Sequence, residues 1–110
     1  MNPLSLSNLA TPVLGGTWAV RLDCTGYGNG FGILTVAALP VTIPRSFGEV
    51  LAGGPRYLRR VRPHLGSVVT FTEPIPNQTA LIGLTACVQG VCTGGGGMSL
   101  SNAIDLVLGF

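Results

Sequence analysis

Apolar and polar residues alternate along several short stretches of this chain. Two of these stretches lie in residues 81–110, on either side of four consecutive glycines at positions 94–97. A period of two is typical of a strand with one buried face. Consecutive glycines favour a chain reversal. We therefore predict a C-terminal β-hairpin, with one face of its strands formed by Ile82, Leu84, Ala86 and Val88 and by Met98, Leu100, Asn102, Ile104, Leu106 and Leu108.

The front half of the chain shows the same period, most clearly over residues 17–24. There Trp18, Val20, Leu22 and Cys24 share one face. Asn29-Gly30 is a strong hairpin-turn signal, and no eleven-residue helical stripe is present. Further strands are expected at 4–9, 31–39, 48–52, 57–61 and 67–72, with a short extended piece bracketed by Pro40 and Pro44.

These elements predict an all-β protein, a single antiparallel two-sheet β-sandwich of about eight or nine strands. The length of 110 residues fits one domain, residues 1–110, with 1–12 as a possible exchanging N-terminal arm. The predicted core consists of Trp18, Leu22, Phe31, Leu34, Val36, Val69, Phe71, Ile82, Leu84 and Leu106.

Composition narrows the choice of partners. Only 9% of the residues are charged, against the usual quarter, which suggests a neutral surface that a neighbouring molecule partly covers. A net charge of +2 does not favour nucleic-acid binding. No apolar run is long enough for a membrane helix, so we expect no membrane insertion. The N-terminus has no basic region followed by an apolar run, so we expect that a signal peptide was removed or that export uses another route.

Several short motifs give the chain a family resemblance. They are Pro12-Val13-Leu14-Gly15, Ile75-Pro76, Leu81-Ile82-Gly83 followed by Gln89, and Leu100-Ser101-Asn102-Ala103-Ile104-Asp105-Leu106 followed by Gly109. In this order they resemble the small C-terminal β-sandwich domain that ends many secreted proteins of planctomycetes and related bacteria. The resemblance implies a β-sandwich fold and an extracellular or cell-surface location. It brings no catalytic residues, and the three cysteines depart from its pattern.

The cysteines are Cys24, Cys87 and Cys92. An exported protein favours one disulfide. The local pair is Cys87 with Cys92, whereas a bridge from Cys24 to one of these two would be long-range; the sequence leaves both open. The third cysteine would be buried, or would pair between chains.

No catalytic or metal-binding constellation is visible. The chain has one histidine, His64, and no nucleophile elbow. With a single histidine and unsuitable cysteine spacing, a metal site is not expected. We predict a non-enzymatic protein without a cofactor and interpret His64 as a surface residue in a basic loop.

All six cations are arginines, and four of them lie in residues 55–64. Arginine forks match carboxylate, sulfate or phosphate groups, so this strip could bind acidic polysaccharide, with Trp18, Tyr27 or Tyr57 as sugar platforms. The alternative interpretation is a charged edge strand protected from aggregation. The candidate anion-binding residues are Arg56, Tyr57, Arg59, Arg60, Arg62 and His64.

An internal repeat relates the two ends of the chain. Residues 4–15 and 98–109 are identical at seven of twelve positions, Ser-Leu-Ser-Asn and Val-Leu-Gly. The repeat can reflect internal pseudo-symmetry or chance. Alternatively, both segments occupy equivalent sheet edges at a subunit junction, where an N-terminal arm, kept off its own sheet by Pro3 and Pro12, lies beside the last strand of the next copy. The protein itself is then the expected partner, in a filament or surface layer, with a junction formed by Leu4, Leu6, Asn8, Leu100, Asn102 and Ile104.

Overall fold

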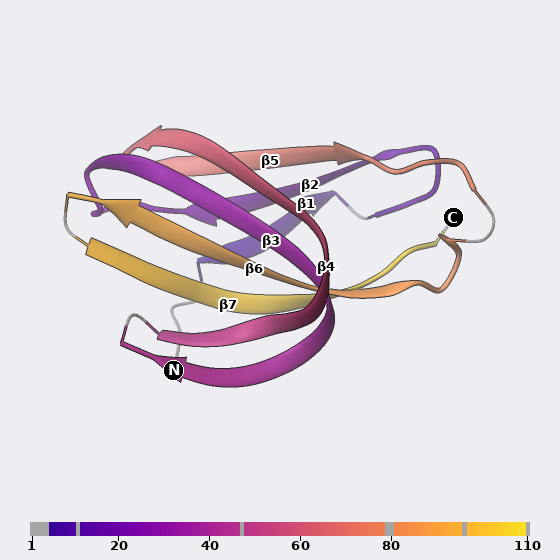
Figure 1. Cartoon of the computed structure of the whole chain (residues 1–110). Helices are drawn as coiled ribbons and strands as arrows, with labels where there is room; N and C mark the ends of the chain where they lie inside the picture. The colour runs from indigo at the N-terminus through magenta and orange to yellow at the C-terminus, as the bar shows by residue number, and fades with distance from the viewer. Residues whose placement is uncertain (1–4, 11, 47, 79–80, 96, 110) are drawn as a thin grey trace.

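The computed structural model describes residues 5–10, 12–46, 48–78, 81–95 and 97–109, and within these residues it contains no α-helix. The described residues form seven strands, and Figure 1 shows that they are arranged in two layers. They are β1 (Leu6–Ala10), β2 (Thr17–Asp23), β3 (Asn29–Arg45), β4 (Gly48–Leu65), β5 (Val68–Pro74), β6 (Thr85–Gly94) and β7 (Gly97–Val107).

Both layers are antiparallel sheets. One has the strand order β1-β2-β5, and the other has the order β4-β3-β6-β7. Their inner faces enclose the core, so the predicted all-β sandwich is confirmed. The predicted C-terminal hairpin is formed by β6 and β7, whose pairing ends at Gly94 and Gly97.

The structure has seven strands rather than eight or nine because several predicted pieces merge. Residues 48–52 and 57–61 both belong to β4, and the segment between Pro40 and Pro44 belongs to β3. β3 and β4 stay paired along their full lengths, with register shifts between Val36 and Ile43 that accommodate the prolines and glycines. The predicted turn at Asn29-Gly30 is wrong, because these residues begin β3, and the chain between β2 and β3 passes from one sheet to the other.

The predicted core is mostly confirmed. Seven of its ten residues are buried, namely Trp18, Leu22, Leu34, Val36, Val69, Phe71 and Leu106. The other three are exposed: Phe31 by 51%, Ile82 by 41% and Leu84 by 38%. Phe31 alternates with inward-facing residues of β3, and the other two lie in the segment before β6 begins at Thr85. Buried residues missing from the prediction include Leu6, Val20, Cys24, Val88, Cys92 and Leu100.

A glycine allows the two sheets to approach closely. A Cβ atom at Gly90 on β6 would lie 2.7 Å from Cδ1 of Leu22, which is fully buried on the opposing sheet. Only a glycine fits at this distance without displacing Leu22.

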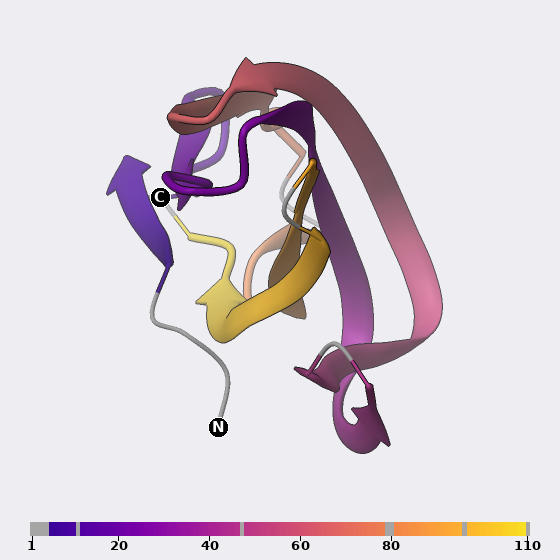
Figure 2. The same cartoon turned by 90° about the vertical axis from the view of Figure 1, so that its left-hand side faces the viewer.

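The far half of the β3–β4 hairpin curls away from the sandwich and turns back beneath β6 and β7, as Figure 2 shows. Ala37 and Ala52 from the hairpin pack there with Cys87 of β6 and Ala103 of β7. This small second core covers part of the outer face of the four-stranded sheet.

Candidate functional site

The predicted subunit junction lies on one long side of the sandwich, where β1 and β7 are the edge strands of the two sheets. Leu4 is outside the described residues. The side-chain amide of Asn102 joins the two edges: Leu6 N donates to Asn102 Oδ1 at 2.9 Å, and Asn102 Nδ2 donates to Leu6 O at 3.0 Å. The structure therefore brings Leu6 and Asn102 together within one chain.

β1 belongs to its own sheet in the structure, where it pairs antiparallel with β2. Leu6 is buried in the core, and Trp18 Nε1 donates a hydrogen bond of 2.9 Å to Asn8 Oδ1. The expectation that Pro3 and Pro12 keep this segment off its own sheet is therefore wrong, because Leu6 and Asn8 give β1 core and polar contacts within the chain.

The β7 residues of the predicted junction face different ways. Ile104 packs against the main core on the inner side, whereas Leu100 is buried near Val91 and Gln89 on the outer side. A register shift between Gln89 and Val91 in the β6–β7 pair accounts for this difference. Within the described residues β7 has a single charged residue, Asp105, and β1 has none.

The opposite long side is formed by β4 and β5, the other two edge strands. Arg60 pairs with Glu73 of β5, and Arg62 Nη1 donates to Thr70 O. β4 also contains Pro55 and Pro63. The arginines and prolines on this side oppose the addition of another strand, as expected for a protected edge.

The structure disperses the predicted anion-binding strip. Arg60 and Arg62 reach across to β5, whereas Arg59 lies beside Thr35 and Gln89 on the outer face. Arg56 and Tyr57 are exposed further along β4. Trp18 is only 2% exposed, so its predicted place in the core is confirmed and it offers no sugar platform. Tyr27 is half-buried against the core.

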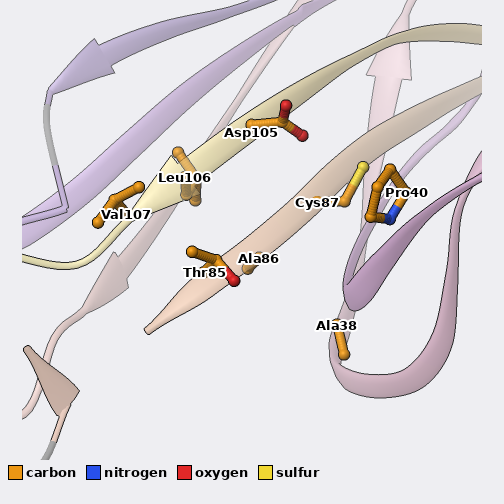
Figure 3. Close-up of a pocket in the computed structure, with 8 residues that line it drawn as sticks. All are labelled: Ala38, Pro40, Thr85, Ala86, Cys87, Asp105, Leu106 and Val107. Carbon is orange, nitrogen blue, oxygen red and sulfur yellow. The ribbon is translucent and has the colours of Figure 1, made fainter. Parts of the chain in front are cut away.

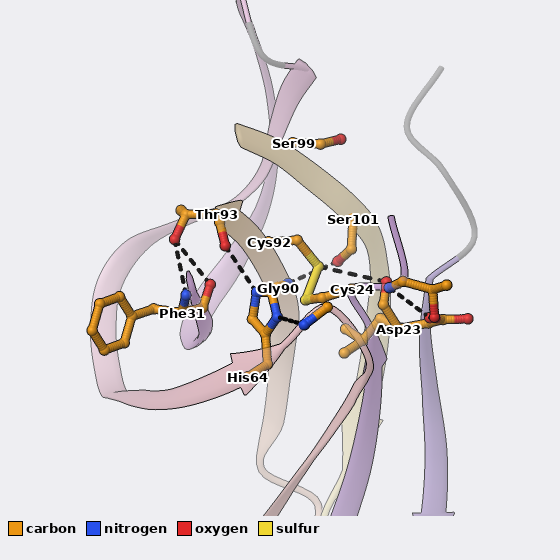
Figure 4. Close-up of a disulfide and its surroundings, with 12 residues drawn as sticks. Asp23, Cys24, Phe31, His64, Gly90, Cys92, Thr93, Ser99 and Ser101 are labelled. Atoms are coloured by element: carbon orange, nitrogen blue, oxygen red, sulfur yellow. Dashed lines mark hydrogen bonds between the residues drawn. A yellow bond between two sulfur atoms is a disulfide. The ribbon is translucent and has the colours of Figure 1, made fainter. Parts of the chain in front are cut away.

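His64 is buried in β4, so its interpretation as a surface residue in a loop is wrong. Figure 4 shows its ring between two backbone partners. Gly66 N donates to Nδ1 at 2.9 Å, and Nε2 lies 2.8 Å from Thr93 O. Since Nδ1 accepts, Nε2 carries the proton and donates it. Both ring nitrogens are therefore occupied: Nε2 joins β4 to β6, and Nδ1 holds the turn that follows β4.

A disulfide joins Cys24, directly after β2, to Cys92 on β6 (Figure 4). It connects the two sheets across 68 residues of sequence. Of the two pairings that the sequence left open, the structure has a long-range one, and the local pair Cys87–Cys92 is not formed. The two cysteines of β6 are five residues apart and so point to opposite faces of the strand.

Cys87 keeps a free, buried thiol beside the curled hairpin. It lines a cleft of about 250 Å³. Figure 3 shows it near Pro40, with Asp105 on the neighbouring strand. Burial, together with the Asp105 carboxylate opposite, raises the pKa of the Cys87 thiol. The thiol donates a weak hydrogen bond to Leu51 O. This environment favours an inert thiol over a nucleophile.

Gln89 has a structural role that was not predicted from the sequence: it is buried and makes three hydrogen bonds. Its Oε1 accepts from Leu51 N at 2.9 Å, and its Nε2 donates to Glu49 O at 2.8 Å and to Ser101 O at 2.9 Å. It thereby fastens the hairpin tip to β6 and β7. The one signal was a long amide inside an otherwise apolar strand, since a buried amide needs partners.

The described residues hold no group of three or more potential metal ligands, and they include no helix that could span a membrane. No protein-family model, curated protein or solved structure matches the chain.

Proposed function

We propose that this protein is a non-catalytic structural module that works outside the cell and associates with copies of itself through the β1–β7 side of the sandwich. The observation that carries the proposal is the contrast between the two long sides. The β4–β5 side contains arginines and prolines. The described residues of β1 and β7 include one charged residue and no proline.

The free backbone groups of an edge strand pair readily with another strand. Charges and prolines oppose such pairing, so the β1–β7 side is the side at which a second copy can add. If β1 of one copy lies beside β7 of the next, the contact is head-to-tail and builds an open fibre.

Exchange of β1 between copies is a second geometry for the same contact. β1 would leave its own β2 and take the equivalent place in the next copy, where Asn102 would again bind Leu6. Exchange of an identical element repeats native contacts and is a low-cost route to association.

The disulfide supports the proposed compartment. A disulfide that joins the two sheets is typical of proteins in oxidising surroundings, outside the cytosol. The resemblance to the terminal domains of secreted bacterial proteins agrees with this location. The low charge content is consistent with a surface that is partly covered in an assembly.

Negative-stain micrographs of the full chain test the proposal, because a single copy of 11.3 kDa is far smaller than an assembly. We expect elongated particles. Deleting residues 1–11 should abolish them. This deletion removes Leu6 from the core, so a second variant, Leu9→Lys, places a charge on an exposed position of β1 and leaves Leu6 and Asn8 in place. A folded Leu9→Lys protein that forms the same particles would show that β1 is not part of the joint.

A further inference from the structure

The end of the sandwich away from the disulfide opens into a pocket of about 390 Å³ between the two sheets. Its walls include three pairs of residues that lie opposite each other on neighbouring strands. They are Trp18 with Glu73, Val36 with Leu58, and Ala86 with Leu106. Trp18 lies near one end of β2, whereas Cys24 follows the other end. The pocket and the disulfide therefore occupy opposite ends of the core.

The lining of the pocket is apolar except at one side. Leucine, isoleucine, proline and two aromatic residues, Trp18 and Tyr57, line most of it. The Glu73 carboxylate is the one charged group among the lining residues, with a side chain only 15% exposed. Arg60, which pairs with Glu73, has a side chain 49% exposed and is not part of the lining. Glu73 therefore borders the pocket, whereas the guanidinium group of Arg60 lies toward solvent.

The segment before β6 adds apolar surface at the mouth of the pocket. Leu81 and Leu84 belong to its lining, and Leu84 is 38% exposed. The alternating pattern had predicted that Leu84 lies in the core. Instead, it borders the opening. When an apolar molecule covers an apolar wall that was in contact with solvent, the free energy of the system falls.

We propose that this pocket binds a small molecule with an apolar body and a hydrogen-bond donor at one end, of which a medium-chain aliphatic alcohol is the simplest example. A volume of about 390 Å³ is within the ~300–1,000 Å³ typical of small-molecule sites, which are mostly apolar with a few placed polar groups. The apolar body packs against Tyr57 and the leucines of the lining. The donor binds Glu73, because a carboxylate can accept further hydrogen bonds while it is paired with an arginine.

The charge of Glu73 gives the site its selectivity. A ligand of the same length that ends in a carboxylate instead of a hydroxyl would be repelled by Glu73 and would lack the donor. We expect 1-octanol to bind about tenfold more tightly than octanoate at neutral pH, a ratio that corresponds to about 1.4 kcal/mol.

Trp18 is the single tryptophan of the chain and lies in the wall of the pocket, so its fluorescence reports binding directly. Titration of the full chain with 1-octanol should give a saturable change in emission, with a weaker response to octanoate. Glu73→Gln should bring the two affinities close together. Ala86→Leu should fill the pocket and abolish the response. Ala19→Leu, on the outer face of β2 next to Trp18, is the matched control and should respond as the original chain does.

Melting curves of all three variants establish that each is folded before its titration is interpreted. The proposal is overturned if the original chain gives no saturable response to 1-octanol, or if Ala86→Leu folds and still responds as before. Equal affinities for octanol and octanoate in the original chain would also contradict it, since Glu73 would then have no part in the site. None of these outcomes depends on self-association.

Discussion

Two side-chain amides join strands that share no backbone ladder. Asn102 bridges the edge strands β1 and β7, and Gln89 fastens the hairpin tip to β6 and β7. An amide offers donors and an acceptor together, so one residue can replace a pair of ladder hydrogen bonds. The sequence suggested a structural contact for Asn102 only.

Side-chain alternation predicted which residues of a strand share a face, and this was sufficient for Trp18, Leu22 and Phe71. It did not predict the partners of polar residues. His64 and Gln89 each bond to a strand distant in sequence, His64 to Thr93 at 29 residues of separation and Gln89 to Leu51 and Glu49 at 38 and 40. Alternation also could not choose between the disulfides, because the choice depends on which strand faces Cys24 across the core.

The first prediction concerns the reactivity of the Cys87 thiol. Because burial and the Asp105 carboxylate raise the pKa of its thiol, the reactive thiolate is scarce at neutral pH. Asp105→Asn removes the carboxylate and so lowers this pKa, and we expect alkylation by iodoacetamide at pH 8 to become faster. The rate is measured by mass spectrometry of the alkylated peptide.

Met98→Asn, at an exposed position of the same strand outside the lining of this cleft, is the control and should leave the alkylation rate unchanged. A rate for Asp105→Asn equal to that of the original chain would show that burial alone governs the Cys87 thiol.

At the scale of elements, the long β3–β4 hairpin is the feature that the sequence predicted least well. Prolines and glycines near residues 40 and 53–55 suggested breaks between short strands. In the structure, register shifts in the β3–β4 pair absorb these residues while the pairing continues. A bulge and a turn use the same residue types, so composition alone does not separate them.

The attachment of this hairpin gives a second prediction. Gln89→Leu leaves Leu51 N, Glu49 O and Ser101 O without this amide. Each polar group left unsatisfied by the loss of its partner costs about 1–3 kcal/mol where it stays buried. We expect a lower free energy of unfolding and faster hydrogen exchange at the Leu51 amide, measured by denaturant unfolding and by NMR. Gln78→Leu, at an exposed position, is the matched control.

If Gln89→Leu leaves exchange at Leu51 unchanged, other contacts hold the hairpin tip. The small cluster of Ala37, Ala52, Cys87 and Ala103 would then be sufficient to keep it in place.

At the scale of the whole molecule, the two sheets are held together by a shared core, by the Cys24–Cys92 bridge and by side chains that cross each long side. The crossing groups differ in kind: Asn102 on the β1–β7 side, and Arg60 and Arg62 on the other. The sequence predicted a sandwich and a neutral surface. It could not show that the arginine-rich strand β4 lies on the side opposite to β1 and β7, because this depends on the strand order of the two sheets.

The central claim is that copies join through the β1–β7 side, and sedimentation velocity over a range of protein concentrations measures this association most directly. Two matched substitutions place a lysine at an exposed valine of an edge strand: Val107→Lys on β7, and Val68→Lys on β5. The account predicts that the original chain and Val68→Lys form large species as concentration rises, whereas Val107→Lys remains a single copy. A single-copy mass for the original chain at every concentration, or equal association by both lysine variants, would contradict it.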